Sequence, residues 1–213
     1  MAKVKVKICG ITNWTDARRA VDAGAQFLGF NFYRPSPRYI RPDAARRIVR
    51  RLPRNVAAVG VFVNEPEESM LAIARRVGIR YLQLHGDEAP TLVARLKRKF
   101  PVIKALRVRE SFRSAQLADF RHATALLLDG FDKSLFGGTG KTFDWNLARR
   151  ANGRRRIFVA GGLTPENIAD AIRIVRPYAV DVCSGVEARP GRKDPARIVA
   201  LMGAVKAAGT KRK

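Results

Sequence analysis

Residues 157–165 read Ile-Phe-Val-Ala-Gly-Gly-Leu-Thr-Pro, and this short stretch contains a complete passage from strand to helix. The apolar run Ile157–Ala160 is typical of a buried strand, and the two glycines after it indicate a turn. Thr164 before Pro165 predicts a helix start, because the hydroxyl caps free amide groups and proline fits the first helical position. The stretch therefore predicts one βα unit.

The same passage recurs along the chain, which alternates short apolar runs with longer amphipathic segments, as in βα units around a parallel sheet. Eight strands are predicted, at Val4–Ile8, Phe27–Phe32, Val56–Val63, Tyr81–Leu84, Val102–Leu106, Ala125–Leu128, Ile157–Ala160 and Ala179–Val182. Eight helices are predicted to follow them, at Trp14–Ala23, Pro42–Arg51, Pro66–Val77, Ala89–Lys99, Ser111–Ala118, Asp144–Ala151, Pro165–Val175 and Asp194–Ala207.

The positions of the glycines favour a closed barrel over an open, doubly wound sheet. An open dinucleotide-binding sheet needs several glycines after its first strand, whereas Cys9–Asn13 contains only Gly10. Glycine-rich turns instead follow the sixth, seventh and eighth predicted strands, where barrels hold a phosphate. We therefore expect a single-domain α/β fold, a TIM (β/α)8 barrel, over residues 1–208, followed by a basic tail over residues 209–213.

Length and composition limit the class of protein. The chain has 213 residues, 46% hydrophobic and 28% charged, which suits one globular domain. No apolar run approaches the roughly 18 residues that a membrane span needs, and the N-terminus lacks the pattern of a secretory signal. Two cysteines and two histidines are too few for a disulfide scaffold or a metal cluster. We expect a cytoplasmic protein without a membrane contact or a metal site.

The barrel does not explain the formal net charge of +24. General interpretations are a basic proteome or solubility, and the specific one is nucleic-acid binding. Basic residues are spread over predicted helices, as at Arg46, Arg47, Arg50 and Arg51, and no nucleic-acid-binding module is recognised. We expect no specific nucleic-acid partner, and note that a positive field also attracts a small anionic substrate.

The three late glycine turns predict a phosphate site. Glycine permits close approach, so that amide groups and a helix N-terminus can point at a phosphate dianion. A tight bend explains any one turn, whereas three turns at consecutive strand ends favour a shared site. Leu135 stands where a nucleotide P-loop needs its first glycine, which argues against ATP or GTP. The candidate residues are Gly138, Gly140, Gly161, Gly162, Ser184 and Gly185.

Cys9 is a candidate base, because strand alternation turns Lys5, Lys7 and Cys9 inward and places Cys9 nearest the C-terminal rim. A thiol with a lowered pKa can abstract a proton, and the Lys7 ammonium would favour the thiolate. The alternative is that Cys9 is a small buried core residue. The same argument for catalysis is weaker for Cys183.

Asp129 is a candidate acid, because it ends the sixth predicted strand at the same rim. A partly desolvated carboxyl with a raised pKa is a workable general acid, although many aspartates at strand ends only cap loops. Asp132 in the next loop and Asp181 at the end of the eighth strand compete for the role, and Asp181 is also a candidate for substrate binding.

Two further side chains are candidates for substrate binding. Arg38 lies in the proline-stiffened loop after the second strand, where a guanidinium can clamp a carboxylate or merely be solvated. His85 follows Gln83 at the end of the fourth strand, and either substrate contact or a satisfied buried imidazole explains it.

Eight blocks along the chain show a family resemblance: Lys7–Thr12, Ser36–Ile40, Val61–Asn64, Gln83–Gly86, Leu127–Asp129, Gly137–Trp145, Gly161–Leu163 and Val180–Glu187. In their order and spacing they closely resemble the phosphoribosylanthranilate isomerase family of tryptophan biosynthesis. The resemblance spans nearly the whole chain.

This resemblance implies an intramolecular oxidoreductase that performs an Amadori rearrangement with neither metal nor cofactor. Its substrate would be N-(5-phosphoribosyl)anthranilate and its product 1-(2-carboxyphenylamino)-1-deoxyribulose 5-phosphate. The family's base falls on Cys9 and its acid on Asp129. Arg38 matches the arginine that holds the anthranilate carboxylate, and the glycine turns match the phosphate cradle.

Two alternatives remain. The related sugar-phosphate isomerase of histidine biosynthesis uses two aspartates and resembles a duplicated half-barrel, whereas this chain has Cys9 after its first strand and no internal repeat. A non-catalytic, polyanion-binding barrel is the second alternative, motivated by the charge. The expected partner is a small phosphorylated molecule, and the sequence does not distinguish a monomer from a homodimer.

Overall fold

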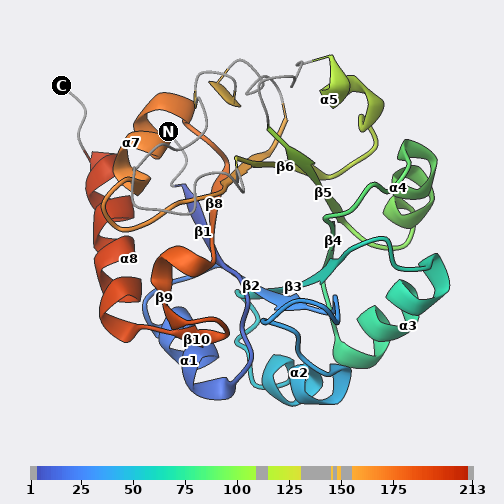
Figure 1. The fold of residues 1–213 in the computed structure, drawn as a ribbon, viewed down its shortest axis with the longest axis horizontal. Coiled ribbons are helices and arrows are strands. Elements are labelled where there is room, and N and C mark those ends of the chain that lie inside the picture. Colours follow the sequence, from blue (N-terminus) through green and yellow to red (C-terminus); the bar gives the residue numbers. More distant parts are fainter. Residues whose placement is uncertain (1–3, 109–114, 131–144, 146–147, 150–154, 211–213) are drawn as a thin grey trace.

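The computed structural model of the chain describes residues 4–108, 115–130, 145, 148–149 and 155–210, and its eight long parallel strands close into a barrel. Each strand pairs with the next, and β1 pairs with β8 (Figure 1). The strands are β1 (Lys5–Ile8), β2 (Phe27–Asn31), β3 (Ala57–Phe62), β4 (Tyr81–Leu84), β5 (Val102–Arg107), β6 (Ala125–Asp129), β7 (Ile157–Ala160) and β8 (Ala179–Val182). The predicted TIM barrel is confirmed.

Helices surround the barrel, and those that precede α8 lead back into the next strand (Figure 1). They are α1 (Trp14–Asp22), α2 (Pro42–Val49), α3 (Glu67–Val77), α4 (Pro90–Lys97), α5 (Gln116–Asp119), α7 (Ile168–Val175) and α8 (Pro195–Thr210). The predicted helix Asp144–Ala151 lies mostly outside the described residues, as does the first part of Ser111–Ala118.

Strand alternation produces two apolar layers. Val6 and Ile8 of β1 belong to the layer between the strands and the helices. The residues that alternate with this layer along the strands face the barrel interior. There Phe27 of β2 and Phe158 of β7 pack edge to face, with their ring centroids 5.4 Å apart. Because this apolar layer fills the barrel interior, the buried Lys7–Asp181 pair lies toward its C-terminal end, and Lys5 Nζ donates to the Tyr178 hydroxyl at the other end.

The helix predicted from Pro165 begins three residues later, at Ile168. The side chain of Asn167 accepts a hydrogen bond from the Thr164 amide, and it donates one to the Gly162 carbonyl. These bonds hold residues 164–167 as a turn rather than as the first helical turn. Pro165 therefore predicted correctly that a helix follows β7, but the predicted first residue of that helix was wrong.

A hairpin between β8 and α8 has no counterpart among the predicted elements. The 3₁₀ turn η2 (Ser184–Val186) leads into β9 (Glu187–Arg189), which pairs antiparallel with β10 (Arg192–Lys193) beside α1 (Figure 1). The Lys193 amide donates to Asp16 Oδ2 of α1 at 3.0 Å. Such short, charged strands lack the apolar alternation on which strand prediction depends.

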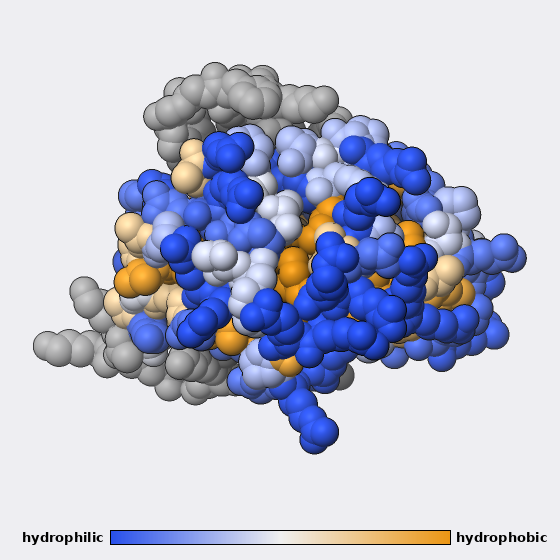
Figure 2. Space-filling model, turned by 90° about the horizontal axis from the view of Figure 1, so that it is seen from below, coloured by the Kyte–Doolittle hydropathy of each residue, from blue (hydrophilic) through white to orange (hydrophobic). Residues whose placement is uncertain are grey.

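Charged side chains follow the polarity of the helices. In α3, for example, Glu67 and Glu68 lie in the first turn and Arg75 and Arg76 in the last. This arrangement matches the helix dipole, so part of the positive charge stabilises helix ends. Hydrophilic residues cover most of the side of the molecule that Figure 2 shows. Within the described part of the chain, no helix has the length and apolar character to cross a membrane.

Candidate active site

Cys9 lies just beyond β1, beside a buried ion pair. Lys7 of β1 and Asp181 of β8 are register partners on neighbouring strands, and Lys7 Nζ lies 2.8 Å from Asp181 Oδ2. Their side chains are 0% and 6% exposed. Lys7 and Cys9 share one face of β1, as alternation predicts, so the ammonium lies next to the thiol.

The surroundings of Cys9 favour its thiolate. A hydrogen bond from Cys183, together with the charges of Lys7 and Lys193, outweighs burial and holds the pKa of Cys9 well below its usual range. The hydrogen bond to Cys9 and burial raise the pKa of the Cys183 thiol. These opposite shifts favour ionisation at Cys9 and the protonated thiol at Cys183.

Asp181 is incompletely satisfied. Burial raises its pKa to about 7, although the Lys7 ammonium acts in the opposite direction. Burial would lower the pKa of Lys7, but Asp181 and Cys9 outweigh it and raise that pKa above its ordinary value. Asp181 Oδ1 is buried and lacks a hydrogen-bond partner among the described residues. Burying a polar atom without a hydrogen-bond partner lowers stability by about 1–3 kcal/mol. The unpartnered oxygen therefore indicates a place for a polar group of a ligand.

Gly29 in β2 makes room for this cluster. A Cβ at this position would lie 2.6 Å from Cys9 Sγ and 3.0 Å from Lys7 Nζ. Any larger residue would displace the thiol or the ammonium. Gly29 is not among the predicted site residues. The one signal in the sequence is that a glycine interrupts an apolar strand, which often marks the close approach of another group.

Arg38 lies at the same rim, where it is bonded to Glu187 of β9. Its Nη2 lies 2.6 Å and its Nε 3.0 Å from Glu187 Oε2, and the side chain keeps 23% of its surface exposed. Lys193 Nζ also donates to Glu187, at 3.0 Å. Burial would raise the pKa of Glu187, but Arg38 and Lys193 outweigh it and lower that pKa. Glu187 is not predicted from the sequence as a site residue, because 149 positions separate it from Arg38.

Asp129 and His85 form the other side of the rim. His85 Nε2 lies 3.0 Å from Asp129 Oδ2, and His85 Nδ1 lies 2.9 Å from the amide nitrogen of Gln83. An amide nitrogen only donates, so in this arrangement Nδ1 accepts and Nε2–H donates to Asp129. Both side chains of the His85–Asp129 pair are partly exposed, at 25% and 19%. The competing candidate Asp132 lies outside the described residues.

The structure brings two of the three glycine turns together. Gly161 and Gly162 after β7 adopt φ values of +89° and +63°, which favour glycine. A Cβ on Gly185 would overlap the carbonyl oxygen of Leu163, so the turn after β8 packs directly against the turn after β7. Ser184 begins η2 in the same turn. Gly138 and Gly140 lie outside the described residues.

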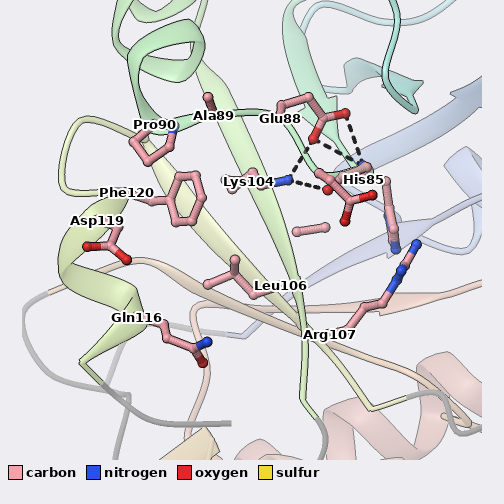
Figure 3. Close-up of a pocket in the computed structure, with 13 residues that line it drawn as sticks. His85, Glu88, Ala89, Pro90, Lys104, Leu106, Arg107, Gln116, Asp119 and Phe120 are labelled. Carbon is pink, nitrogen blue, oxygen red and sulfur yellow. Dashed lines mark hydrogen bonds and ion pairs between the residues drawn. The ribbon is translucent and has the colours of Figure 1, made fainter. Parts of the chain in front are cut away.

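A cavity of about 380 Å³ extends the His85 side outward. It is lined by the segment after β4, by the end of β5 and by α5, and Arg107 and His85 are among the lining side chains that Figure 3 draws. Deeper in, Lys104 is paired with Glu88 (Figure 3). None of the described residues forms a group of three or more His, Cys, Asp or Glu that could hold a metal ion.

A thiolate beside an ammonium, a carboxyl held by a histidine and paired glycine turns all lie at the C-terminal end of one barrel. Fold and site together define a (β/α)8-barrel enzyme equipped for acid–base chemistry at this rim. A family model described as N-(5'phosphoribosyl)anthranilate (PRA) isomerase matches residues 6–204. The chain belongs to this family of isomerases of tryptophan biosynthesis, and the predicted resemblance is confirmed.

Individual relatives agree. The chain is 52% identical over 196 residues to an N-(5'-phosphoribosyl)anthranilate isomerase of Trichlorobacter lovleyi, covering 92% of this chain and 94% of the relative. A phosphoribosyl anthranilate isomerase structure from Thermotoga maritima has a TM-score of 0.89 at 45% identity, covering 96% and 99%. Another structure of such an isomerase, in complex with reduced 1-(o-carboxyphenylamino)-1-deoxyribulose 5-phosphate, has a TM-score of 0.85 at 43% identity, with the same coverage.

Proposed function

We propose that the chain converts N-(5-phosphoribosyl)anthranilate to 1-(2-carboxyphenylamino)-1-deoxyribulose 5-phosphate, with Cys9 as general base and Asp129 as general acid. The observation that carries the assignment of the base is the thiolate environment of Cys9, built by Cys183, Lys7 and Lys193. The relative solved with the reduced carboxyphenylamino-deoxyribulose phosphate supports the substrate class.

The acid acts first. Asp129 protonates the ring oxygen of the ribose, the furanose opens, and the anthranilate nitrogen and sugar C1 form a Schiff base. Because His85 donates to Asp129 Oδ2, the acidic proton is carried on the other carboxyl oxygen. Besides contacting the substrate, His85 thereby orients the acid.

The base then completes the rearrangement. The Cys9 thiolate removes the proton from sugar C2, and the electron pair shifts toward nitrogen to give an enolamine. Tautomerisation yields the ketone, so that C1 is reduced and C2 oxidised within one molecule. The Lys7 ammonium stabilises the thiolate before the transfer, and Asp181 Oδ1 accepts a hydrogen bond from a substrate hydroxyl.

Arg38 and the glycine turns hold the two anionic ends of the substrate. The anthranilate carboxylate replaces part of the contact between Arg38 and Glu187, since a guanidinium can bind two carboxylates through different nitrogens. The phosphate binds the amide groups of Gly161, Gly162, Ser184 and Gly185, together with Gly138 and Gly140.

We also propose the domain organisation, the cellular location and the oligomeric state of the protein. Residues 1–208 form the catalytic domain and residues 209–213 a basic tail. The enzyme works in the cytoplasm as a monomer or homodimer, and it has no specific nucleic-acid partner.

The fluorescence decay of enzymatically generated phosphoribosylanthranilate tests the activity. Cys9→Ala and Asp129→Asn should each lower kcat by about 10³-fold, the size expected for losing a general base or acid, while KM stays within a few-fold. Near-normal turnover in either variant contradicts the assigned role. A wild-type chain that leaves the fluorescence unchanged contradicts the proposed reaction.

Arg38→Ala should mainly raise KM, by about tenfold, because one charge-assisted contact to the carboxylate is lost in both ground and transition states. Arg18→Ala is the matched control, because Arg18 pairs on the surface with Asp22 at the far end of α1. An unchanged KM in Arg38→Ala removes Arg38 from the carboxylate site.

A further inference from the structure

The chain has two cysteines among its 213 residues, and the fold places them side by side. Cys9 follows β1 and Cys183 follows β8, and the preceding residues, Ile8 and Val182, are register partners. The Cys9 amide donates to the Val182 carbonyl at 2.9 Å, so the pairing continues to the cysteines. Their side chains then emerge on the same face of the sheet.

The spacing of the two cysteines suits a covalent bond. Neighbouring strands lie about 4.8 Å apart, and disulfides join Cα atoms separated by roughly 4.4 to 6.8 Å. The two thiols also influence each other electrostatically, since each shifts the pKa of the other. A Cβ on Gly10 would lie 3.0 Å from Cys183 Sγ, and one on Gly29 would lie 2.6 Å from Cys9 Sγ, so small residues hold the space around both sulfurs open.

The two thiols have complementary chemical states. Cys9 is the thiolate, with Lys7 beside it, and a thiolate is the nucleophile that attacks a peroxide. Cys183 keeps its proton and is the donor to Cys9. Both cysteines keep part of their surface exposed at the rim of the barrel. An attacking thiolate beside a second thiol is the arrangement of redox-sensitive cysteine pairs.

We propose that Cys9 and Cys183 form a peroxide-reactive thiol pair that closes into a reversible disulfide. Cys9 sulfur attacks one peroxide oxygen and breaks the O–O bond, giving a sulfenic acid and releasing water or an alcohol. Cys183 sulfur then attacks Cys9 sulfur, the S–O bond breaks, and the Cys183 proton leaves with the hydroxide as water. The two sulfurs lose two electrons, which reduce the peroxide. Only the accompanying loss of isomerase activity rests on the function proposed above.

Hydrogen peroxide added to the reduced, full-length protein tests this proposal. We expect the intact mass to fall by about 2 Da as titratable thiols fall from two to none, with the protein unchanged in size on a non-reducing gel. Turnover should fall in parallel by at least about tenfold, because Cys9 is then no longer a base, and dithiothreitol should restore thiols and turnover together.

Cys183→Ser is the matched variant, since a hydroxyl replaces the thiol without creating a cavity. Peroxide should then raise the mass by about 32 Da as Cys9 reaches the sulfinic acid, and dithiothreitol should no longer restore turnover. The proposal is overturned if the wild type gains oxygen without losing two protons, if disulfide-linked dimers appear, or if Cys183→Ser recovers like the wild type. A disulfide that forms while turnover persists supports the pair and contradicts the role of Cys9 as base.

Discussion

Among the buried lysine–carboxylate pairs at the C-terminal rim, two differ in how fully their polar atoms are satisfied. Lys7 of β1 and Asp181 of β8 form one, at 2.8 Å, on the inner face of the barrel. Lys104 of β5 and Glu88 form the other, at 2.6 Å, on the outer face, where the Lys104 ammonium lies 5.6 Å from the Phe120 ring centroid. All four side chains are almost completely buried.

In the outer pair, both Glu88 and Lys104 form hydrogen bonds to backbone groups in addition to the bond between them. Glu88 accepts from the amides of Asn64 and Gly86 as well as from Lys104, and Lys104 also donates to the Gly86 carbonyl at 2.7 Å. These bonds tie together the segments after β3 and β4. In the inner pair, Asp181 Oδ1 has no partner among the described residues, and Lys7 lies next to the reactive Cys9.

This difference distinguishes a pair that holds the fold together from a pair that can bind a ligand. A buried pair whose atoms are all bonded holds two segments in place, and removing one partner strands a charge. A buried pair with an unpartnered oxygen keeps binding capacity that the protein itself does not use. The inner pair thus keeps a free binding position for a ligand, and in the function proposed above its place beside Cys9 makes it part of the catalytic site.

The largest expected effect is that of Lys7→Met on turnover. We expect kcat to fall by about 10³-fold, because the Cys9 thiolate loses its nearest cation and the base becomes a neutral thiol. Stability should fall less, since Asp181, with its pKa already raised to about 7, can take up a proton. Steady-state kinetics and thermal unfolding measure the two effects, and an unchanged kcat makes the inner pair merely structural.

Lys104→Met should break the outer pair with the opposite balance. We expect the free energy of unfolding to fall by about 3 kcal/mol, because the buried Glu88 carboxyl loses its cation. The folded fraction should keep kcat within about threefold, since no proposed reacting group contacts Lys104. Urea unfolding combined with kinetics checks this, and a collapse of kcat in fully folded protein contradicts the comparison.

The smallest effect is a pH dependence carried by Asp181. Its folded pKa, about 7, lies above the unfolded value of about 3.9, so the folded chain binds the proton more tightly. This group therefore stabilises the fold at low pH, and its contribution is lost as the pH rises from about 4 to about 7. Between pH 5 and pH 6.5 the loss should be about 2 kcal/mol.

Comparing the wild type with Asp181→Asn isolates this contribution, because carboxyl groups elsewhere titrate in both proteins. The difference between their free energies of unfolding should change across the window in the direction given. A difference that is constant with pH shows that Asp181 stays ionised in the folded chain.

Most of the architecture was predictable, because it depends on short-range patterns. Apolar residues recur about every second position in strands and about every fourth in helices. This periodicity predicted all eight barrel strands within two residues of the observed ends. Prolines predicted helix starts well at Pro42 and Pro195, where the structure begins α2 and α8. The same signal was wrong at Pro165, because the side chain of Asn167 formed a competing turn.

The candidate site was predictable only in part. Alternation along β1 predicted that Lys7 and Cys9 face inward together, and the ends of strands predicted Asp129 and Asp181 at one rim. Gly29 and Glu187 were missed. Glu187 gains its role from a contact 149 positions away, which no local pattern contains, whereas Gly29 carried a local signal, a glycine inside an apolar strand.

The sequence by itself determined the repeat of strand and helix, the closure suggested by the late glycines and the family to which the chain belongs. Tertiary structure alone decided which charges are satisfied and which thiols meet. Closing the barrel pairs β1 with β8, so Cys9 meets Cys183 and Lys7 meets Asp181 across 174 positions. The physical reason is that pKa values and hydrogen bonds depend on distances of a few ångströms, which the fold sets and the order of residues does not show.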